Sequence, residues 1–340
     1  MAALKEITKL NGLTMKQLAR LTGIKYTTLA TTAKKPITTW TSEVKAQVAG
    51  ALKMDVSAFE QAMSDQVLSP FIKWVGGKRQ LLPSLVSYLP KNYRTYYEPF
   101  VGGGALLLRL APNHAVINDF NGELTNTYQQ VKDHLPELSE RLKQHQYQDS
   151  KDYYLDLRSV DRDGRIVSMS AVDRAARFIY LNKAGYNGLW RVNSKGQNNV
   201  PYGSHKSLNL VTKSLKTDSE YFQKADVKIL TGDYAAAVKD VVAGDLVYFD
   251  PPYIPVKPTA NFTTYTKAGF GLIQQEQLRD LAKELTEKSV SVMLSNADVA
   301  LTRELYADPI FHLHEIQAMR YINSKANGRG KVGELIITNY

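Results

Sequence analysis

Cysteine is absent from the 340 residues, which excludes disulfides and thiolate metal sites. This absence is typical of proteins in a reducing cytoplasm. The six histidines form no HxxxH pair of the kind that binds a metal, so the sequence predicts no metal site. The stretch His312–His314 reads HLH, and its alternation is more typical of a strand with one exposed face.

Long apolar runs are absent as well. No run approaches the ~18 residues that a membrane-spanning helix needs. The first residues, MAALKEITKLNG, lack the apolar core of a signal peptide. The sequence therefore predicts a cytoplasmic protein without a membrane partner, and its 340 residues allow one large domain or two to three smaller ones.

Acidic residues are outnumbered, because 33 Asp and Glu stand against 43 Lys and Arg, a net charge of +10. A basic balance of this size favours a polyanionic partner. Nucleic acid is favoured over a membrane surface because no basic amphipathic helix stands out. Charge alone does not distinguish a nucleic-acid-binding surface from an ordinary basic surface.

Residues 1–64 carry a helix–turn–helix pattern. Thr14 suits the N-cap of a first helix, and Gly23 suits the tight turn before a second helix at 26–33. The segment resembles repressor-type helix–turn–helix modules, and nine Lys and Arg against four acids give it a charge of +5. We expect DNA binding, with a small helical bundle for packing or dimerisation as the alternative. Met15, Leu18, Ala19 and Leu21 give the first helix its apolar spacing, and the second exposes Lys25, Thr27, Thr28, Thr31 and Lys34.

A linker at 65–70 leads into short apolar strands that alternate with helices. Strands are expected at YYEPF, HAVINDF, VKILTGDY, GDLVYFDPPY and VSVMLSN, and GLIQQEQLRDLAKELTEK is an amphipathic helix. The pattern predicts an α/β domain at 71–134 and 225–340, with a buried, mostly parallel sheet and helices on both faces. The polar stretch 135–224 interrupts the alternation, and a long loop-rich insertion of this kind is usually functional.

Three glycines, Gly102 to Gly104, lie between a short strand and an apolar helix in EPFVGGGALLLRL. They let the backbone pass close to a ligand and turn into the helix. Asp119 ends the next strand, 15 residues after Gly104, where an acid accepts hydrogen bonds from ribose hydroxyls. The spacing is not GxGxxG, and no Lys-Ser or Lys-Thr follows. An adenosine-containing ligand without a pyrophosphate therefore fits better than a nicotinamide or a nucleoside triphosphate.

A second glycine-containing cluster, FIKWVGGKRQLLP, precedes this loop. It is either a basic turn before a helix or a loop that closes over the ligand. In the second interpretation Trp74 and Lys78 are the contacts.

The stretch DLVYFDPPYIP ends an apolar strand with Asp250, Pro251, Pro252 and Tyr253. Ligands of doubly wound folds bind at the carboxyl ends of such strands. The prolines hold an extended backbone, which leaves their carbonyls free as acceptors. An acid, a fixed carbonyl and an aromatic face together suit the exocyclic amino group of a planar base. An ordinary strand-ending turn is the alternative.

These blocks together resemble DNA adenine-N6 methyltransferases of the Dam type, over about Phe71–Tyr340. FIKWVGGKRQ, EPFVGGGALLL, LNKAGYNGLWRVNSKGQNNVPYG, DPPYIP with TANFTTYT, LSNAD with LTRELY, and INSKANGRGKVGELIITNY occur in the family's order. The resemblance implies a Rossmann-like, S-adenosylmethionine-dependent fold, with the target-recognition domain inserted at 135–224. It also implies double-stranded DNA as the partner, in the cytoplasm of a bacterium or a phage-infected host. Protein partners and oligomeric state stay open.

The resemblance implies a role for each motif. The target adenine is flipped out of the duplex, Tyr253 stacks on it, and Asp250 and the Pro251 carbonyl accept the two N6 hydrogens. Pro252 completes the catalytic motif, and no metal takes part. Cofactor contacts are implied for Trp74, Lys78, Glu98, Phe100, Gly102, Gly104, Asp119 and Asp250. Gly103 stands where relatives often have alanine, a small departure.

Target recognition is implied for AGYNGLWR and its surroundings. Tyr186 and Asn187 match the positions that intercalate and fill the base-pair gap. GATC is the implied target, although Ala184 and Trp190 depart from the family's usual residues and put strict specificity in doubt. Base contacts are implied for Lys73, Leu189, Arg191 and Pro201, with Arg191 bidentate to guanine and Pro201 against a thymine methyl.

Two alternatives stay open at the level of sequence. Related Pro-Pro-Tyr motifs serve RNA and protein amide methyltransferases. A DNA-binding regulator with an inert catalytic domain is the other alternative, although intact Asp119, Asp250 and Tyr253 argue against it.

Overall fold

A computed structural model describes residues 2–33, 37–56, 59, 62–63, 68–255, 270–319 and 331–340. The chain divides into two compact units, Met1–Ser69 and Pro70–Tyr340. Lys34, residues 65–67 of the expected linker and the TANFTTYT segment lie outside the described residues. Among the described residues, no helix is long and apolar enough to cross a membrane.

The smaller unit is helical. Helix α2 (Met15–Thr22) is capped at its N-terminus. The Thr14 hydroxyl accepts from the Gln17 amide, and the Gln17 side chain accepts from the Thr14 amide. Gly23 then adopts a left-handed φ of 70°, which a residue with a side chain rarely takes. The elements are α1 (Ala2–Leu10), α2 (Met15–Thr22), α3 (Tyr26–Thr32), the short 3-10 helix η1 (Ile37–Thr39) and α4 (Ser42–Ala51).

The two expected helices and the Gly23 turn between them are present in this unit. Leu18, Ala19 and Leu29 are buried in one apolar core with Leu4, Trp40 and Phe59. Leu21, which belongs to the apolar spacing of the first helix, lies on α2, but its side chain is 61% exposed. The Thr22 hydroxyl, one position on, donates to the Leu18 carbonyl instead.

The larger unit is built on a mixed sheet. Its described strands form a seven-stranded sheet in the order β3-β2-β1-β4-β5-β7-β6. β1 to β5 run parallel, and β7 and β6 add an antiparallel edge. The strands are β1 (Tyr96–Glu98), β2 (His114–Asp119), β3 (Asp226–Thr231), β4 (Leu246–Phe249), β5 (Ser291–Ala297), β6 (His312–Met319) and β7 (Lys331–Thr338). The five expected strands and the strand at His312 are all present; β7 was not expected.

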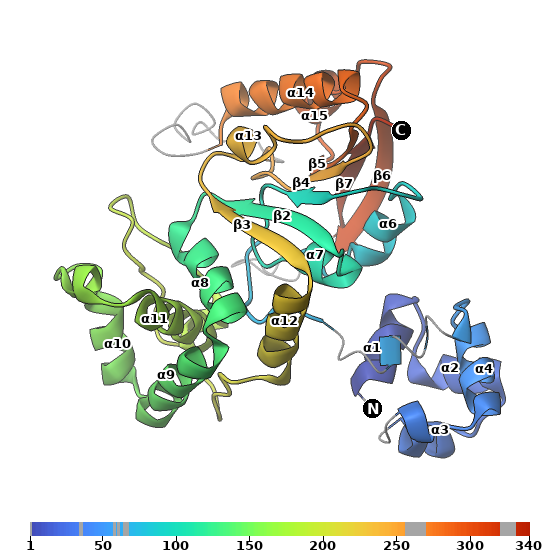
Figure 1. The fold of residues 1–340 in the computed structure, drawn as a ribbon, viewed down its shortest axis with the longest axis horizontal. Helices are drawn as coiled ribbons and strands as arrows, with labels where there is room; N and C mark the ends of the chain where they lie inside the picture. Colours follow the sequence, from blue (N-terminus) through green and yellow to red (C-terminus); the bar gives the residue numbers. More distant parts are fainter. Residues whose placement is uncertain are drawn as a thin grey trace. The chain divides into compact units, whose positions relative to one another are not determined.

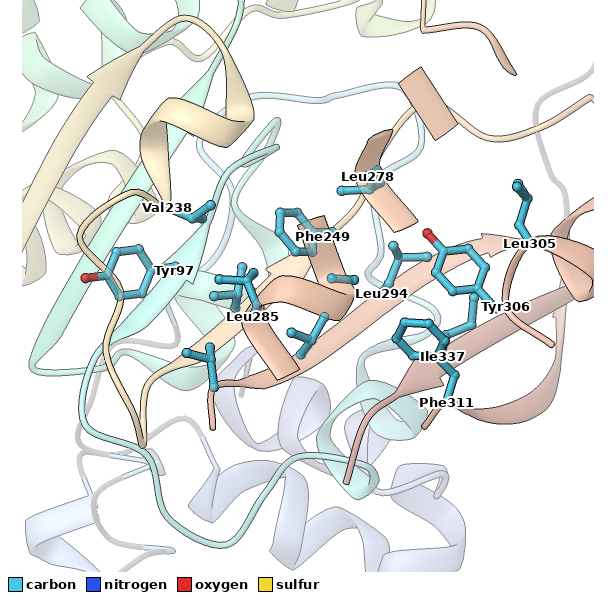
Figure 2. Close-up of a cluster of buried hydrophobic side chains, with 14 of the residues drawn as sticks. Tyr97, Val238, Phe249, Leu278, Leu285, Leu294, Leu305, Tyr306, Phe311 and Ile337 are labelled. Atoms are coloured by element: carbon cyan, nitrogen blue, oxygen red, sulfur yellow. The ribbon is translucent and has the colours of Figure 1, made fainter. Parts of the chain in front are cut away.

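Helices cover both faces of the sheet (Figure 1). On one face lie α13 (Tyr234–Ala237), α14 (Leu272–Glu287) and α15 (Ala300–Leu305). On the other lie α6 (Leu82–Ser87), α7 (Ala105–Leu110), α8 (Gly122–Asp133) and α12 (Lys213–Lys224). Figure 2 shows the core beneath α14, where Leu278 and Leu285 meet Phe249 and Leu294 of the sheet. These packed layers hold the ends of β1 and β4 rigidly.

The inserted stretch is helical first and loop-rich afterwards. Its central helix, α11, packs against α8 and α9. The Arg177 side chain of α11 is buried, where its Nε donates to the Leu157 carbonyl at 2.8 Å. The elements are α9 (Leu135–Gln148), α10 (Lys151–Ser159), η2 (Arg165–Ser168), α11 (Ala171–Ala184) and η3 (Tyr186–Gly188).

Candidate active site

The sheet reverses its winding between β1 and β4. From β1 the chain builds β2 and β3 on one side, then returns to add β4 and β5 on the other. β1 and β4 pair in parallel, with Tyr96 opposite Leu246, so their carboxyl ends lie at the same edge. The glycine loop follows β1 and Asp250 follows β4. The topological switch point is where ligands bind in open α/β sheets.

The glycine loop packs so closely against Trp74 and Tyr128 that a side chain at Gly102 or Gly104 would clash with them. Gly102 and Gly104 have φ values of 47° and 64°. A Cβ on Gly102 would lie 2.6 Å from Cδ1 of Trp74, and one on Gly104 would lie 2.7 Å from the Tyr128 hydroxyl. That hydroxyl donates to the Gly102 carbonyl at 3.0 Å. The Gly102 amide donates to Asp119 Oδ2, also at 3.0 Å. The loop therefore brings together Trp74 and Asp119, which the sequence had proposed separately.

The end of β2 presents both an acid and an open aromatic face. Asp119 Oδ1 accepts from the Asn121 amide at 2.9 Å, and burial raises the pKa of the Asp119 carboxyl. Phe120 is 84% exposed beside it. Asn118 pins the strand end by donating to the carbonyls of Pro99 and Gly232, each at 3.0 Å. Phe120 was not predicted as a site residue, although an aromatic residue directly after a strand-ending acid is a visible signal in the sequence.

Asp250 pairs with Lys78. Their Oδ1 and Nζ atoms are 2.7 Å apart, and Nζ also donates to the Gly76 carbonyl at 2.8 Å. The same Nζ lies 4.7 Å from the centre of the Tyr253 ring. Burial raises the pKa of Asp250, and the Lys78 charge opposes that rise. Three expected site residues therefore form one contiguous group.

The Asp-Pro-Pro-Tyr loop is held by a buried amide network. Gln275 of α14 donates to the Pro252 carbonyl at 2.9 Å, so the expectation that this carbonyl stays free was wrong. Asn296 of β5 donates to Gln275 Oε1 at 3.0 Å and accepts from the Ile254 amide at 3.1 Å. Neither amide was predicted from the sequence, because no local pattern distinguishes these two buried residues from exposed polar residues of a helix or a strand.

Tyr253 is oriented by the antiparallel edge. Its hydroxyl donates to Glu334 of β7 at 3.1 Å. Burial and the nearby Asp250 raise the pKa of the Tyr253 hydroxyl well above its usual value, so it stays a neutral donor. Glu334 is a further residue beside the site that was not predicted from the sequence.

Glu98 and Phe100 have their own partners. The Glu98 carboxylate is buried, where it accepts from the Tyr96 hydroxyl at 2.8 Å and from the Leu107 amide at 3.1 Å. Burial raises the pKa of Glu98 to about 8. The Phe100 ring stacks on Tyr234, with centroids 5.1 Å apart. These contacts support the loop, and the proposed ligand contacts of both residues stay a prediction.

Asn182 ties the AGYNGLWR segment to the first glycine cluster. This buried side chain accepts from the Lys73 amide at 3.1 Å and donates to the Lys73 carbonyl at 2.8 Å and the Gly188 carbonyl at 3.1 Å. A Cβ on Gly188 would collide with the Lys73 side chain. Lys73 therefore lies beside the AGYNG turn, and its proposed contact with DNA stays a prediction. Lys183, the neighbour of Asn182, has its pKa lowered to about 8 by burial and by the charges of Lys73 and Arg79.

The expected base-contacting residues are largely open to solvent. Tyr186 is 53% exposed, and its amide donates to the Pro201 carbonyl at 2.9 Å. Asn187 has a left-handed φ of 57°. Arg191 Nε donates to Asn199 Oδ1 at 2.6 Å across a hairpin. Lys73, Asn187, Arg191 and Pro201 are exposed, and Leu189 is half-buried.

The family model for the D12 class N6 adenine-specific DNA methyltransferases matches residues 74–322. A relative described as type II methyltransferase M1.LlaDCHI, from Lactococcus lactis subsp. cremoris, is 53% identical over 274 residues, covering 80% of this chain and 96% of the relative. Type II methyltransferase M.MjaIII of Methanocaldococcus jannaschii is 37% identical over 292 residues, covering 80% and 99%. A DNA adenine methylase of Vibrio cholerae is 35% identical over 269 residues, covering 78% and 94%.

These matches favour an adenine-specific DNA enzyme over the RNA and protein amide alternatives. The family model spans the glycine loop, the recognition segment and the Asp-Pro-Pro-Tyr motif together. The chain belongs to the D12 class N6 adenine-specific DNA methyltransferase family.

Proposed function

We propose that the larger unit transfers a methyl group from S-adenosylmethionine to N6 of an adenine flipped out of duplex DNA, with GATC as the target sequence. The observation that carries the proposal is the group formed by Asp250, Lys78 and Tyr253 at the switch point of the sheet. It offers a carboxylate acceptor and an aromatic ring beside the glycine loop.

The glycine loop fits S-adenosylmethionine as a cofactor. Gly102 and Gly104 let the loop pack directly against Trp74 and Tyr128, and the loop backbone carries no side chain there that would keep a ligand away. Asp119 has lone pairs left for ribose hydroxyls. The exposed Phe120 ring offers a face for the adenine of the cofactor. Bound there, the cofactor would supply an electrophilic methyl group on a sulfonium.

Catalysis then depends on positioning N6. The Asp250 carboxylate and the Pro251 carbonyl accept its two hydrogens, which draws the N6 lone pair out of conjugation and aims it at the methyl carbon. The bound cofactor would supply the methyl group, and N6 would release one proton to water once it carries that group. Asp250 acts in its ionised form, which the Lys78 charge favours. Holding the reacting atoms in line supplies much of the rate.

DNA recognition is assigned to the segment around α11 and η3. Tyr186 and Asn187 are exposed on the turn after α11, which suits insertion into the stack beside the extruded adenine. Arg191 has N–H donors beyond the Nε that Asn199 occupies, so a bidentate contact to guanine is available. Lys73, Leu189 and Pro201 complete the proposed contact surface.

The target is tested by sequencing modified bases after expression in cells that lack adenine methylation. The expected result is N6-methyladenine at GATC. Methylation at another adenine-containing motif would reject the GATC assignment while keeping the activity. A genome without methylated adenine would reject the proposal.

The mechanism is tested with Asp250→Ala. Methylation should fall below detection while affinity for a GATC duplex is largely kept, because Asp250 contacts the reacting amino group and not the duplex. Asp240→Ala removes an exposed acid of the same unit and serves as the control. Substantial activity in the Asp250 variant would show that another group orients N6.

A further inference from the structure

The smaller unit has no role in the methylation chemistry described above. The family model begins at residue 74, and the relatives are covered almost completely by alignments of 269 to 292 residues. The unit nevertheless has its own buried core, which includes Leu18, Leu29, Trp40, Val48 and Phe59. A separately folded unit outside the family region implies a separate function.

The exposed face of α3 is made of polar side chains. Leu29 anchors the helix in the core, while Thr27, Thr28 and Thr31 are exposed on it. Lys25, directly before the helix, is exposed as well. The Gly23 turn brings α2 and α3 into contact, and this packing fixes the orientation of α3 within the unit. Hydroxyls and an ammonium on one helix face are groups that hydrogen-bond base edges and phosphates.

The charge of this motif matches a polyanion. From Thr14 to Ala33 the chain has three basic residues, Lys16, Arg20 and Lys25, and no acid. All three are exposed. A helix that presents hydroxyls directly after an exposed lysine has the chemistry needed for the major groove, which admits an α-helix. Leu21 and Tyr26 are also exposed and suit contacts with thymine methyls or sugars.

We infer that α3 is a second DNA-reading element, which gives the chain a second function: sequence-specific binding of duplex DNA at sites that it does not methylate. The occupant of the α3 face is B-form DNA in its major groove. The inference rests on the smaller unit alone, so it stands or falls separately from the methylation target.

The test is a selection from random DNA duplexes that contain no GATC, with the full chain and without cofactor. The chain should enrich a defined motif. Thr27→Ala/Thr28→Ala should weaken binding to that motif by about tenfold or more, since each lost base contact costs about that much. Alanine is the better helix former, so these changes favour folding. Gln47→Ala on α4 also truncates an exposed polar side chain and should leave binding unchanged.

Two further readouts separate the two functions. The Thr27/Thr28 variant should methylate a short GATC duplex at the rate of the unchanged chain. Asp250→Ala should bind the selected motif normally. Failure to enrich any motif would overturn the inference, as would equal binding by the Thr27/Thr28 variant. A dimer of the full chain that Leu21→Ser dissociates, with no motif enriched, would instead assign the unit to self-association.

Discussion

Gly102→Ala tests how closely the glycine loop packs against Trp74. The residue has a φ of 47°, and its missing Cβ would lie 2.6 Å from Cδ1 and 3.0 Å from Nε1 of Trp74. The Trp74 ring has little room to withdraw, because it stacks on Phe178 with centroids 6.1 Å apart. The substitution therefore strains the backbone and overpacks the loop at once.

The two costs can be added, since one is local to the backbone and the other arises between side chains. A left-handed alanine costs about 1–2 kcal/mol. Overpacking costs about 1–3 kcal/mol. A total of about 2–5 kcal/mol would lower the melting temperature of the larger unit by roughly 4–20 °C, at about 2–4 °C per kcal/mol.

Scanning calorimetry with and without S-adenosylmethionine measures both this loss and the weakened cofactor binding that should accompany it. Gly103→Ala is the matched control: its φ is not in the left-handed region, and its Cβ would lie 3.2 Å from Trp74 Cβ, a contact that a small shift relieves. Trp74→Ala should rescue part of the loss, with a coupling of about 1 kcal/mol or more. Equal effects of Gly102→Ala and Gly103→Ala, or strict additivity with Trp74→Ala, would refute the reasoning.

The remaining predictions concern the catalytic and recognition residues. Lys78→Met removes the charge that lowers the pKa of buried Asp250, so the acidic limb of kcat/KM against pH should move to higher pH; an unmoved limb would show that Asp250 is not the titrating group. Arg191→Ala should reduce discrimination at one guanine by about 1–3 kcal/mol, measured as the ratio of kcat/KM on GATC and single-substituted duplexes, whereas equal losses on every duplex would reassign Arg191 to phosphate contact.

Much of the sheet could be predicted because its signals are local. Leu246 to Phe249 form an apolar run that must be buried on both faces, and Asp250 with the two prolines ends it abruptly. The same logic located β1 with its glycine loop and β2 with Asp119. The left-handed φ values of Gly102 and Gly104 were also foreseeable, since consecutive glycines between strand and helix serve few other purposes.

The partners of the site residues could not be predicted, because they depend on contacts between distant segments. Asn182, Gln275 and Asn296 are buried amides whose hydrogen bonds go to backbone groups and to one another. No spacing rule relates them to the motifs they hold. Glu334 reaches Tyr253 only because β7 inserts antiparallel between β5 and β6. Local spacing can also mislead: Leu21 belongs to the apolar spacing of its helix, yet its side chain is exposed.

One set of aromatic contacts joins the glycine loop to the segment that carries Arg191. Trp74 lies against Gly102 on one side and stacks on Phe178 of α11 on the other. Phe178 in turn contacts Trp190, with centroids 4.0 Å apart, directly before Arg191 in the chain. Close-packed rings have few alternative arrangements, so a shift at one end changes the packing at the other. A substitution at Trp190 should therefore disturb the support of the glycine loop as well as the segment that carries Arg191.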